Sequence, residues 1–503
     1  MRRSQSQRCA LARRVRGPAR AVLFCLILVP ALGGCLLGTE RPDAALDVPP
    51  RYRMAPHNQD AALPSVIWWR GFRDKQLIGL IEEALTSNLD IAAAVARILQ
   101  ADANSRIAGA PLVPAIDFHA STTRSRASQT TSPGGLINNT GPAERSLYSM
   151  SLSASYEIDF WGKNRAALRA AEELAVASRY DREVVALTTV SAVANAYFLV
   201  QSAQDRLVTQ RNNLEAATRV LRLVEERFKV GTASALDTAQ QETLVNNVRA
   251  VLPLLEQQLR ENIAILAVLI GRAPAFVTVK VTGTGPIAIP PVTPGLPSDL
   301  LTQRPDIREA EAQLASTNAN VESARAAMLP SIQLTGEGGW ASAALRTLIR
   351  PESAFWTLTA GLVQPLLDGW RLQGQLDFQR GRQEEALQLY RRAVVGAFGD
   401  VERALIAVQQ TARREQLQRE VVRSSRQAFE ISETRLREGA VDLITVLNTQ
   451  QSLFVAEDNL HQARLARLQA VVSLFVALGG GWPIAPKRVA ERVNHPDGQM
   501  KLP

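Results

Sequence analysis

The segment from Leu147 to Phe160, LYSMSLSASYEIDF, decides the fold together with the long segment that follows it. From Tyr148 onward every second residue is apolar, and the residues between are serine, glutamate or aspartate. This alternation predicts a β-strand with one apolar and one polar face. Residues 163–230 then contain neither proline nor glycine. They permit a single helix of roughly 100 Å, at about 1.5 Å per residue.

A seven-residue repeat runs through this long segment. Apolar residues recur at Ala186, Val193, Val200, Leu207, Leu214, Leu221 and Phe228, and a second series follows three positions later at Ala196, Ala203, Ala217 and Val224. A sustained heptad repeat predicts left-handed supercoiled packing against neighbouring helices. The small alanines would allow a close approach between the helices.

The chain then repeats this organisation. Pro114-Ala115-Ile116 returns 216 positions later as Pro330-Ser331-Ile332, and the turn at Gly231 returns 208 positions later at Gly439. At the displacement of 208 the heptads also recur, with Glu415 as the one break, at Val394, Val401, Val408, Val422, Phe429 and Leu436. We therefore predict an internal duplication of helix, strand, strand, long helix, turn and helix.

The duplication sets the expected boundaries. The first repeat should cover 65–270, with strands near 115–125 and 147–160, a long helix over 163–230, and a helix over 234–270. A proline-rich connector would occupy 271–303. The second repeat should cover 304–482, with strands near 331–340 and 355–364 and helices over 371–438 and 443–478, before a tail at 483–503. One helix is expected from about 75 to 108.

The first 34 residues have the pattern of a secretory signal peptide. Seven arginines precede the first carboxylate, Glu40, and account for most of the formal net charge of +9. The basic composition is thus a targeting feature and not a sign of nucleic-acid binding. An apolar stretch ends at Leu32-Gly33-Gly34-Cys35, a pattern that resembles a bacterial lipobox and predicts lipidation of Cys35; an ordinary signal peptide is the alternative. Residues 35–64 would be a proline-rich tether without a fixed fold.

Four strands cannot close a membrane barrel. Open strand edges in lipid would leave backbone groups unpaired at several kcal/mol each. The heptad seams of the long helices also exceed what one chain can cover. Several copies around an axis would satisfy both requirements.

Several motifs carry a resemblance to a known family. They are the lipobox at Cys35, Trp68-Trp69 with Phe72, the Tyr156–Gly162 segment, and above all GLPSDLLTQRPDI from Gly295 to Ile307. The chain resembles the TolC-like outer-membrane factors, in their lipoprotein branch that serves resistance-nodulation-division (RND) efflux systems. The resemblance implies a mainly α protein with a membrane β part: a homotrimer in which a 12-stranded β-barrel continues into a long α-helical barrel. It further implies an outer-membrane exit duct, anchored by lipid with a long periplasmic extension, that works with a periplasmic adaptor and an inner-membrane RND pump.

The resemblance also assigns residues at the two turns. The adaptor-docking tips would be Val230, Gly231, Thr232, Glu438, Gly439 and Ala440. The closed aperture would lie just beyond them, at Asp237 and, where relatives place aspartates, at Thr445 and Asn448. With uncharged groups at the last two positions, we expect a weakly held gate, because each such hydrogen bond contributes only about 1 kcal/mol.

Other function classes have less support. The four histidines are scattered, and no phosphate-binding loop or metal-ligand spacing is present, so we expect no enzyme activity, cofactor or metal. Two alternatives remain open. One is the outer-membrane duct of a type I protein secretion system, and the other is a lipid-anchored periplasmic coiled-coil scaffold.

Overall fold

The computed structural model describes residues 42–46, 49, 51–53, 67–126, 144–292 and 295–480. These residues form two compact units, which are described separately. The first contains Ser105–Ala170 and Ser316–Glu384, and the second contains Ala44–Asn104, Ala171–Ala315 and the chain from Glu385 onward. The predicted signal peptide, Cys35 and the C-terminal tail lie outside the described residues.

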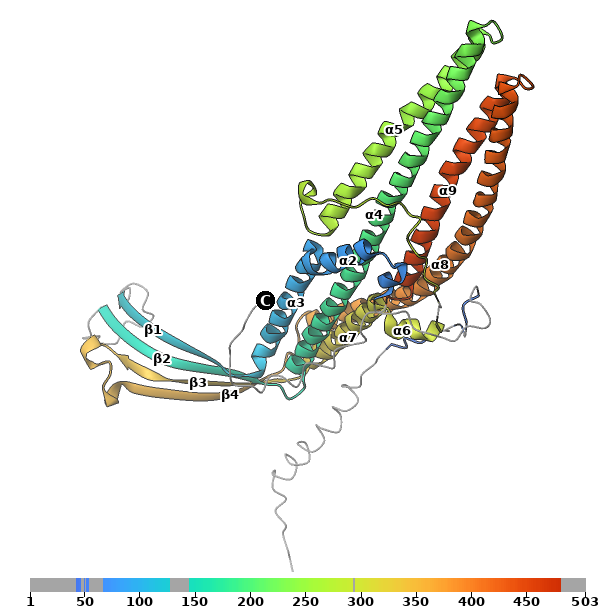
Figure 1. Ribbon diagram of the computed structural model, residues 1–503. Helices are drawn as coiled ribbons and strands as arrows, with labels where there is room; N and C mark the ends of the chain where they lie inside the picture. The colour runs from blue at the N-terminus through green and yellow to red at the C-terminus, as the bar shows by residue number, and fades with distance from the viewer. Residues whose placement is uncertain are drawn as a thin grey trace, which may run out of the picture. The chain divides into compact units, whose positions relative to one another are not determined.

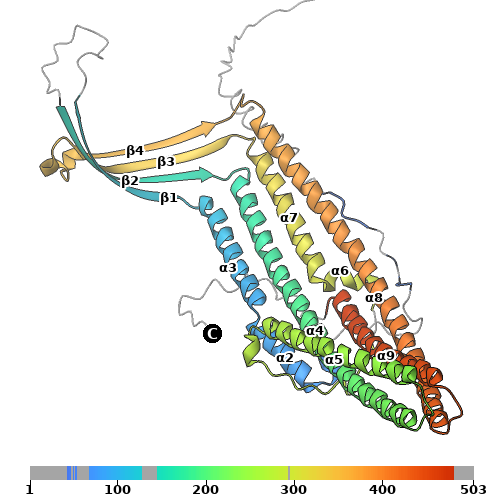
Figure 2. The same ribbon diagram turned by 90° about the horizontal axis from the view of Figure 1, so that it is seen from above.

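The first unit is built on one antiparallel sheet. Its strands are β1 (Ala115–Arg126), β2 (Glu144–Ile158), β3 (Ser331–Ser342) and β4 (Ala354–Val363), in the order β1-β2-β3-β4 (Figure 2). The central pair joins the two repeats, since Leu152 of β2 lies opposite Gly338 of β3. Strand β2 ends two residues before the expected Phe160. The reason is local, because the Asp159 carboxylate accepts hydrogen bonds from the backbone N–H groups of Asn164 and Arg165 at the start of the next helix.

The four principal helices show the duplication directly (Figure 1). Helices α4 (Lys163–Lys229) and α8 (Arg371–Arg437) both have 67 residues, and α5 (Ala235–Leu269) and α9 (Leu443–Ala477) both have 35. Every boundary of one pair lies 208 positions from that of the other. An 18-residue window of α4 is apolar enough to cross a membrane by composition, but half of it is buried inside the protein, as in a core helix.

One helix expected to be continuous is broken, because the segment expected as a single helix over 75–108 forms α2 (Lys75–Ser87) and α3 (Leu89–Gly109). The second repeat has a similar break between α7 (Pro305–Ala326) and the short α6 (Leu300–Gln303), which lies in the segment expected as the connector. Asn88 causes the first break, because its side-chain oxygen accepts from the N–H groups of Asp90 and Ile91 and thereby caps α3. Short 3₁₀ turns complete the described structure at Trp68–Phe72, Ala110–Leu112, Pro274–Phe276, Pro297–Asp299, Leu345–Thr347 and Pro351–Ser353.

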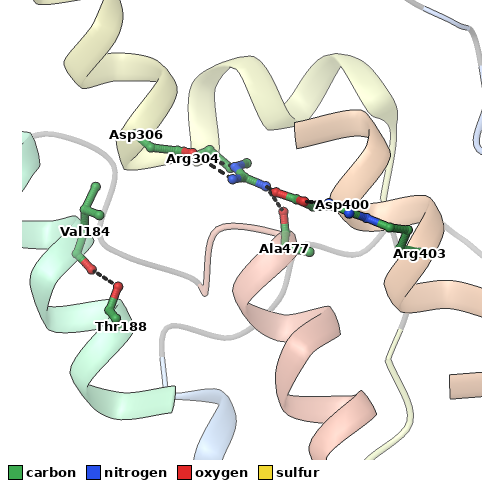
Figure 3. A network of polar contacts seen from close by, with 7 residues as sticks. All are labelled: Val184, Thr188, Arg304, Asp306, Asp400, Arg403 and Ala477. Carbon is green, nitrogen blue, oxygen red and sulfur yellow. Dashed lines mark hydrogen bonds and ion pairs between the residues drawn. The ribbon is translucent and has the colours of Figure 1, made fainter. Parts of the chain in front are cut away.

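The two breaks are equivalent joints. The side-chain amide of Asn88 donates to the carbonyl of Leu269 at the end of α5 (2.8 Å). In the second repeat Arg304 donates to the carbonyl of Ala477 at the end of α9 (3.2 Å) and also binds Asp306 and Asp400 (Figure 3). The QRPDI motif is therefore a structural joint between three helices. Burial lowers the pKa of Arg304, but the hydrogen bonds and charges of the two aspartates outweigh it and raise the pKa overall.

An aromatic core lies in the second unit beside these joints. Trp68 stacks on Phe475 with ring centroids 4.9 Å apart, and Phe72 packs against Phe198 at 5.1 Å. The connector contributes to this core through Val279 and Ile287, which are both buried. The connector is thus part of the packed structure.

The segment expected as a tether is also partly packed. Tyr52 is only 5% exposed and lies in a cluster with Leu300, Val394 and Val401. The expectation that residues 35–64 lack a fixed fold is therefore wrong at Tyr52. Tyr52 stands between charged residues. No apolar period in the sequence therefore indicated that its ring would be buried.

The heptads also differ from expectation in one place. The first series is buried from Ala186 to Leu207, but Phe228 is 48% exposed. The second series is buried throughout, at Ala196, Ala203, Ala217 and Val224. Phe228 lies one residue before the end of α4, next to the exposed turn, whereas Val224 belongs to an apolar cluster with residues of α8 and α9.

Candidate functional site

The sheet has one apolar and one polar face. Phe118, Leu152 and Trp356 belong to one cross-strand row and are 61%, 55% and 81% exposed. Directly opposed residues share a face, so this row defines an exposed apolar surface that runs over all four strands. The next row carries Asp117, Ser153, Glu337 and Thr357 on the other face. A sheet with these two faces can separate lipid from water.

Both outer strands have an unpaired edge. Within the described residues β1 pairs only with β2, and β4 pairs only with β3. The exposed apolar face favours contact with lipid. The backbone N–H and C=O groups at the two edges would then have no water to bind, and leaving them unpaired would cost free energy. The sheet of one chain is therefore incomplete as a membrane structure.

The two turns at the far ends of the helical hairpins have the same geometry. Gly231 and Gly439 have φ angles of +79° and +75°. Thr232 N donates to Arg227 O, and Ala440 N donates to Arg435 O, both at 2.8 Å. A Cβ atom at either glycine would meet no atom within 4 Å, so the left-handed backbone and not a lack of space requires glycine.

The turns lie side by side within the second unit. The guanidinium of Arg227, at the end of α4, donates to the carbonyl of Leu436 at the end of α8 (2.5 Å). An apolar cluster that includes Val224, Phe429 and Val446 joins the hairpins behind them. Of the expected tip residues, Val230 is 74% exposed, and Thr232, Glu438 and Ala440 are exposed as well.

The expected aperture residues occupy helix caps. Asp237 accepts hydrogen bonds from the backbone N–H and hydroxyl of Ser234 (2.7 and 2.9 Å), and Ser234 caps α5 in return. In the second repeat the roles are exchanged, because Asp442 caps α9 and accepts from the N–H and hydroxyl of Thr445 (3.0 and 2.5 Å). These hydrogen bonds from Thr445 lower the pKa of Asp442. Asn448 is exposed one turn further along α9.

Sequence reasoning missed Asp442. It lies 208 positions after Ser234, so the duplication itself was the signal that could have identified it. The N-terminal caps of α5 and α9 each contain one carboxylate, placed three residues earlier in the second repeat than in the first. The absence of an acid at position 445 is therefore not a loss of charge from that cap.

A buried polar contact lies deeper between the hairpins. Gln241 and Gln450 are both fully buried, and the Gln241 amide donates to the Ala217 carbonyl (2.9 Å) and to the Gln450 side-chain oxygen (3.3 Å). Among the described residues, the Gln241 oxygen and the Gln450 nitrogen have no hydrogen-bond partner. A buried polar atom without a hydrogen-bond partner costs free energy, so these two atoms weaken the packing between the two hairpins at this point.

The one break in the second heptad series is a buried ion cluster. Glu415 is 1% exposed and binds Arg419, Arg464 and Arg467. Burial would raise the pKa of Glu415, but the hydrogen bond from Arg467 and the charges of the three arginines hold it below its usual value. Its equivalent in the first repeat is the buried Leu207, so this charge is a feature of one repeat only.

A family model described as "Outer membrane efflux protein" matches residues 80–272 and 296–480. The chain belongs to the outer membrane efflux protein family. It is 40% identical over 458 residues to the pyoverdine export outer membrane protein OpmQ of Pseudomonas aeruginosa, covering 91% of this chain and 95% of that one. It is also 32% identical to the toluene efflux pump outer membrane protein TtgF of Pseudomonas putida, covering 91% and 96%.

Solved outer-membrane channels share the fold. A structure of CusC aligns with a TM-score of 0.78 at 28% identity, covering 88% of this chain and 99% of that one. A structure of the channel OprN aligns with a TM-score of 0.82 at 24% identity, covering 88% and 100%. The resemblance to the TolC-like outer-membrane factors is thus confirmed, and this outer membrane efflux protein works in export.

The predicted lipid anchor at Cys35 lies outside the described residues. Among the described residues no cluster of three or more histidine, cysteine, aspartate or glutamate side chains could hold a metal ion. The parts that remain to carry function are the two-faced sheet, the paired turns and the helical hairpins.

Proposed function

We propose that this protein is the passive outer-membrane exit duct of a tripartite efflux pump and that it works as a homotrimer. The observation that carries the proposal is the four-stranded sheet with an exposed apolar face and two unpaired edges. Three copies would join β4 of one chain to β1 of the next and close a 12-stranded barrel without edges. The polar row with Asp117 and Glu337 would then line its lumen.

The long helices would continue as an α-helical barrel in the periplasm. Apolar side chains remain exposed along α8 at Val395, Leu417 and Val421, and the same chemistry on neighbouring copies would cover them. A lipid on Cys35 would anchor the trimer in the outer membrane. Energy for export would come from the inner-membrane RND pump, since the duct only conducts.

The docking of a periplasmic adaptor is proposed at the tips Val230, Gly231, Thr232, Glu438, Gly439 and Ala440. The aperture is proposed just beyond them, at Asp237, Thr445 and Asn448. The cap geometry adds Asp442 to this set. A weakly held gate agrees with the buried side chains of Gln241 and Gln450 behind the turns, each of which has one polar atom without a hydrogen-bond partner among the described residues.

One experiment tests the docking proposal. If Cys35 carries lipid and the signal peptide is removed, Thr232→Cys supplies the only free thiol of the mature chain. A photoactivatable cross-linker on this thiol should capture a periplasmic adaptor in intact cells. An adaptor of a proton-driven pump would support RND efflux, whereas an adaptor of an ATP-driven exporter would favour type I secretion. A folded protein in the outer membrane that captures nothing at its tip would contradict the docking proposal and favour the scaffold.

We propose small solutes as the cargo, with pyoverdine as the first to test. This rests on the relatives named for pyoverdine export and toluene efflux. The chain would be expressed in Pseudomonas aeruginosa that lacks OpmQ, and pyoverdine in the medium would be measured. Restored export would support this cargo, and a trimer that restores nothing would exclude it.

A further inference from the structure

A cavity of about 480 Å³ lies at the start of α4, within the first unit. Its lining includes the indole of Trp161, the apolar side chain of Leu168, and the charged side chains of Arg165, Arg169, Glu322 and Arg325. The lining therefore combines three arginines and one glutamate with an aromatic side chain. This combination matches a ligand that is apolar at one end and anionic at the other.

Contacts from neighbouring segments hold the cavity in shape. The Trp161 ring nitrogen donates to the carbonyl of Pro330 (2.8 Å), which fixes the indole, and the ring packs edge-on against Phe160. Ser323 of α7 donates to the carbonyl of Lys163 (3.0 Å) and holds α7 against α4. Arg169 and Glu322 form an ion pair across these two helices.

The left-handed backbone of Gly162, with a φ angle of +79°, turns the chain beside one of these arginines, and a Cβ atom there would make only an ordinary contact with the Arg165 guanidinium, at 3.6 Å. That guanidinium is oriented by Asp159, through its carboxylate (3.1 Å) and its carbonyl (2.9 Å). The side chains of Arg165 and Arg169 are still 62% and 58% exposed, so both can reach a ligand.

The second repeat folds without these arginines. At the displacement of 208, Arg165 and Arg169 correspond to Gln373 and Asp377 of α8. Gln373 donates to Asp377 (3.0 Å), and Asp377 pairs with Arg380 of its own helix. The junction between strand and long helix therefore does not require arginine at these two positions, which carry it in the first repeat and not in the second.

We propose that this cavity binds an amphiphilic anion, with a carboxylate or phosphate on the guanidinium groups of Arg165, Arg169 and Arg325 and an apolar body on Trp161 and Leu168. The volume lies within the range of roughly 300–1,000 Å³ that is usual for small-molecule sites. Such an anion has two possible sources, an exported solute or a lipid headgroup beside the sheet. The inference rests on the proposed function only for these sources, and the site itself can be tested without export.

The test uses the full-length protein purified in a nonionic detergent. Binding of 2-naphthoate and of its neutral analogue 2-naphthamide is measured by isothermal titration calorimetry. We expect 2-naphthoate to bind more tightly, and R325Q, which leaves the Arg169–Glu322 pair intact, to raise its Kd about tenfold because one hydrogen bond to a charged group is lost. R169Q should do the same, and the matched control R380Q on α8 should not.

Competition then separates the two sources. If phosphatidylglycerol displaces 2-naphthoate and stays bound to the trimer in native mass spectrometry, the ligand is lipid. If inorganic phosphate competes and phosphatidylglycerol does not, the ligand is a solute. Equal affinity for 2-naphthoate and 2-naphthamide, or an unchanged Kd in both R325Q and R169Q, would overturn the proposal. A failure of export with intact 2-naphthoate binding would instead contradict the proposed function.

Discussion

Replacing Arg304 with alanine should destabilise the protein more than any other single charge removal at the helix joints. The Arg304 side chain is only 12% exposed and donates to three partners. Its two bonds to Asp306 measure 3.0 and 2.7 Å, and those to Asp400 and to the carbonyl of Ala477 both measure 3.2 Å. Removal would therefore separate α7, α8 and the end of α9 at one point (Figure 3).

The magnitude follows from these contacts. Hydrogen bonds to charged groups contribute about 1.5–3 kcal/mol each when they are buried. Asp306 and Asp400 are 36% and 38% exposed, so water would partly replace the lost guanidinium. We expect Arg304→Ala to lower the free energy of unfolding by about 2–3 kcal/mol, and Arg304→Lys by about half as much, because lysine keeps the charge but not the planar fork.

The assay is urea unfolding in detergent, followed by circular dichroism at one fixed protein concentration, because association contributes to stability. Arg403→Ala is the matched control. Arg403 binds the same Asp400 (2.5 Å) from the solvent side, and with its side chain 78% exposed its removal should cost about 0.5 kcal/mol or less. If the unfolding midpoint of Arg304→Ala fell no further than that of Arg403→Ala, the joint would not be stabilising and our reasoning would be refuted.

Three further predictions concern a turn, a half-buried histidine and the N-terminal segment. Gly231→Ala should lower stability by about 1–2 kcal/mol from backbone strain alone, because no atom lies near its Cβ; thermal unfolding would reveal a larger loss if a hidden clash existed. His461 is desolvated, which lowers its pKa below 6.5, so its stabilising effect is complete above pH 6.5 and declines as the pH falls through the folded-state pKa. His461→Gln should flatten this decline in unfolding midpoints measured between pH 7.5 and 5, and an unchanged slope would show that other groups cause it. Tyr52→Ala should destabilise by about 3 kcal/mol by removing a buried ring, and limited proteolysis should then cleave near residue 52; a protease-resistant variant would contradict the packing seen there.

Local periodicity predicted the elements of this fold well. The alternation from Tyr148 predicted a strand, which the structure has from Glu144 to Ile158. The proline-free segments predicted two long helices, and both end within one residue of the expected positions. These patterns reflect the local geometry of the backbone, in which side chains repeat every 2 residues along a strand and about every 3.6 along a helix. They can be recognised without knowing which other segment packs against them.

Contacts over long distances in the sequence were not predictable in the same way. Phe228 belongs to a heptad series and yet is 48% exposed, since it lies at the end of α4 beside the exposed turn. Glu415 interrupts the second series and yet is buried, because three arginines from two helices surround it. No apolar period surrounds Tyr52, so its burial could not be predicted from the sequence.

The candidate site shows the same division. Both tip glycines and their displacement of 208 positions could be recognised, since a tight turn with positive φ favours glycine wherever it occurs. The displacement of 208 positions could also have identified Asp442 as the equivalent of Ser234, but only the structure showed that Asp442 caps α9 and binds Thr445. The cavity beside Trp161 was not predicted, because its lining comes from segments more than 150 residues apart.

The type, length and duplication of the helices and strands follow from the sequence alone, because they depend on the order of apolar, polar and glycine residues along a short stretch. The packed fold was needed to show which heptad residues are buried, which carboxylates cap or pair, and where three arginines lie beside an aromatic ring. Those outcomes depend on distances between residues far apart in the chain, and such distances exist only after the helices have packed against one another.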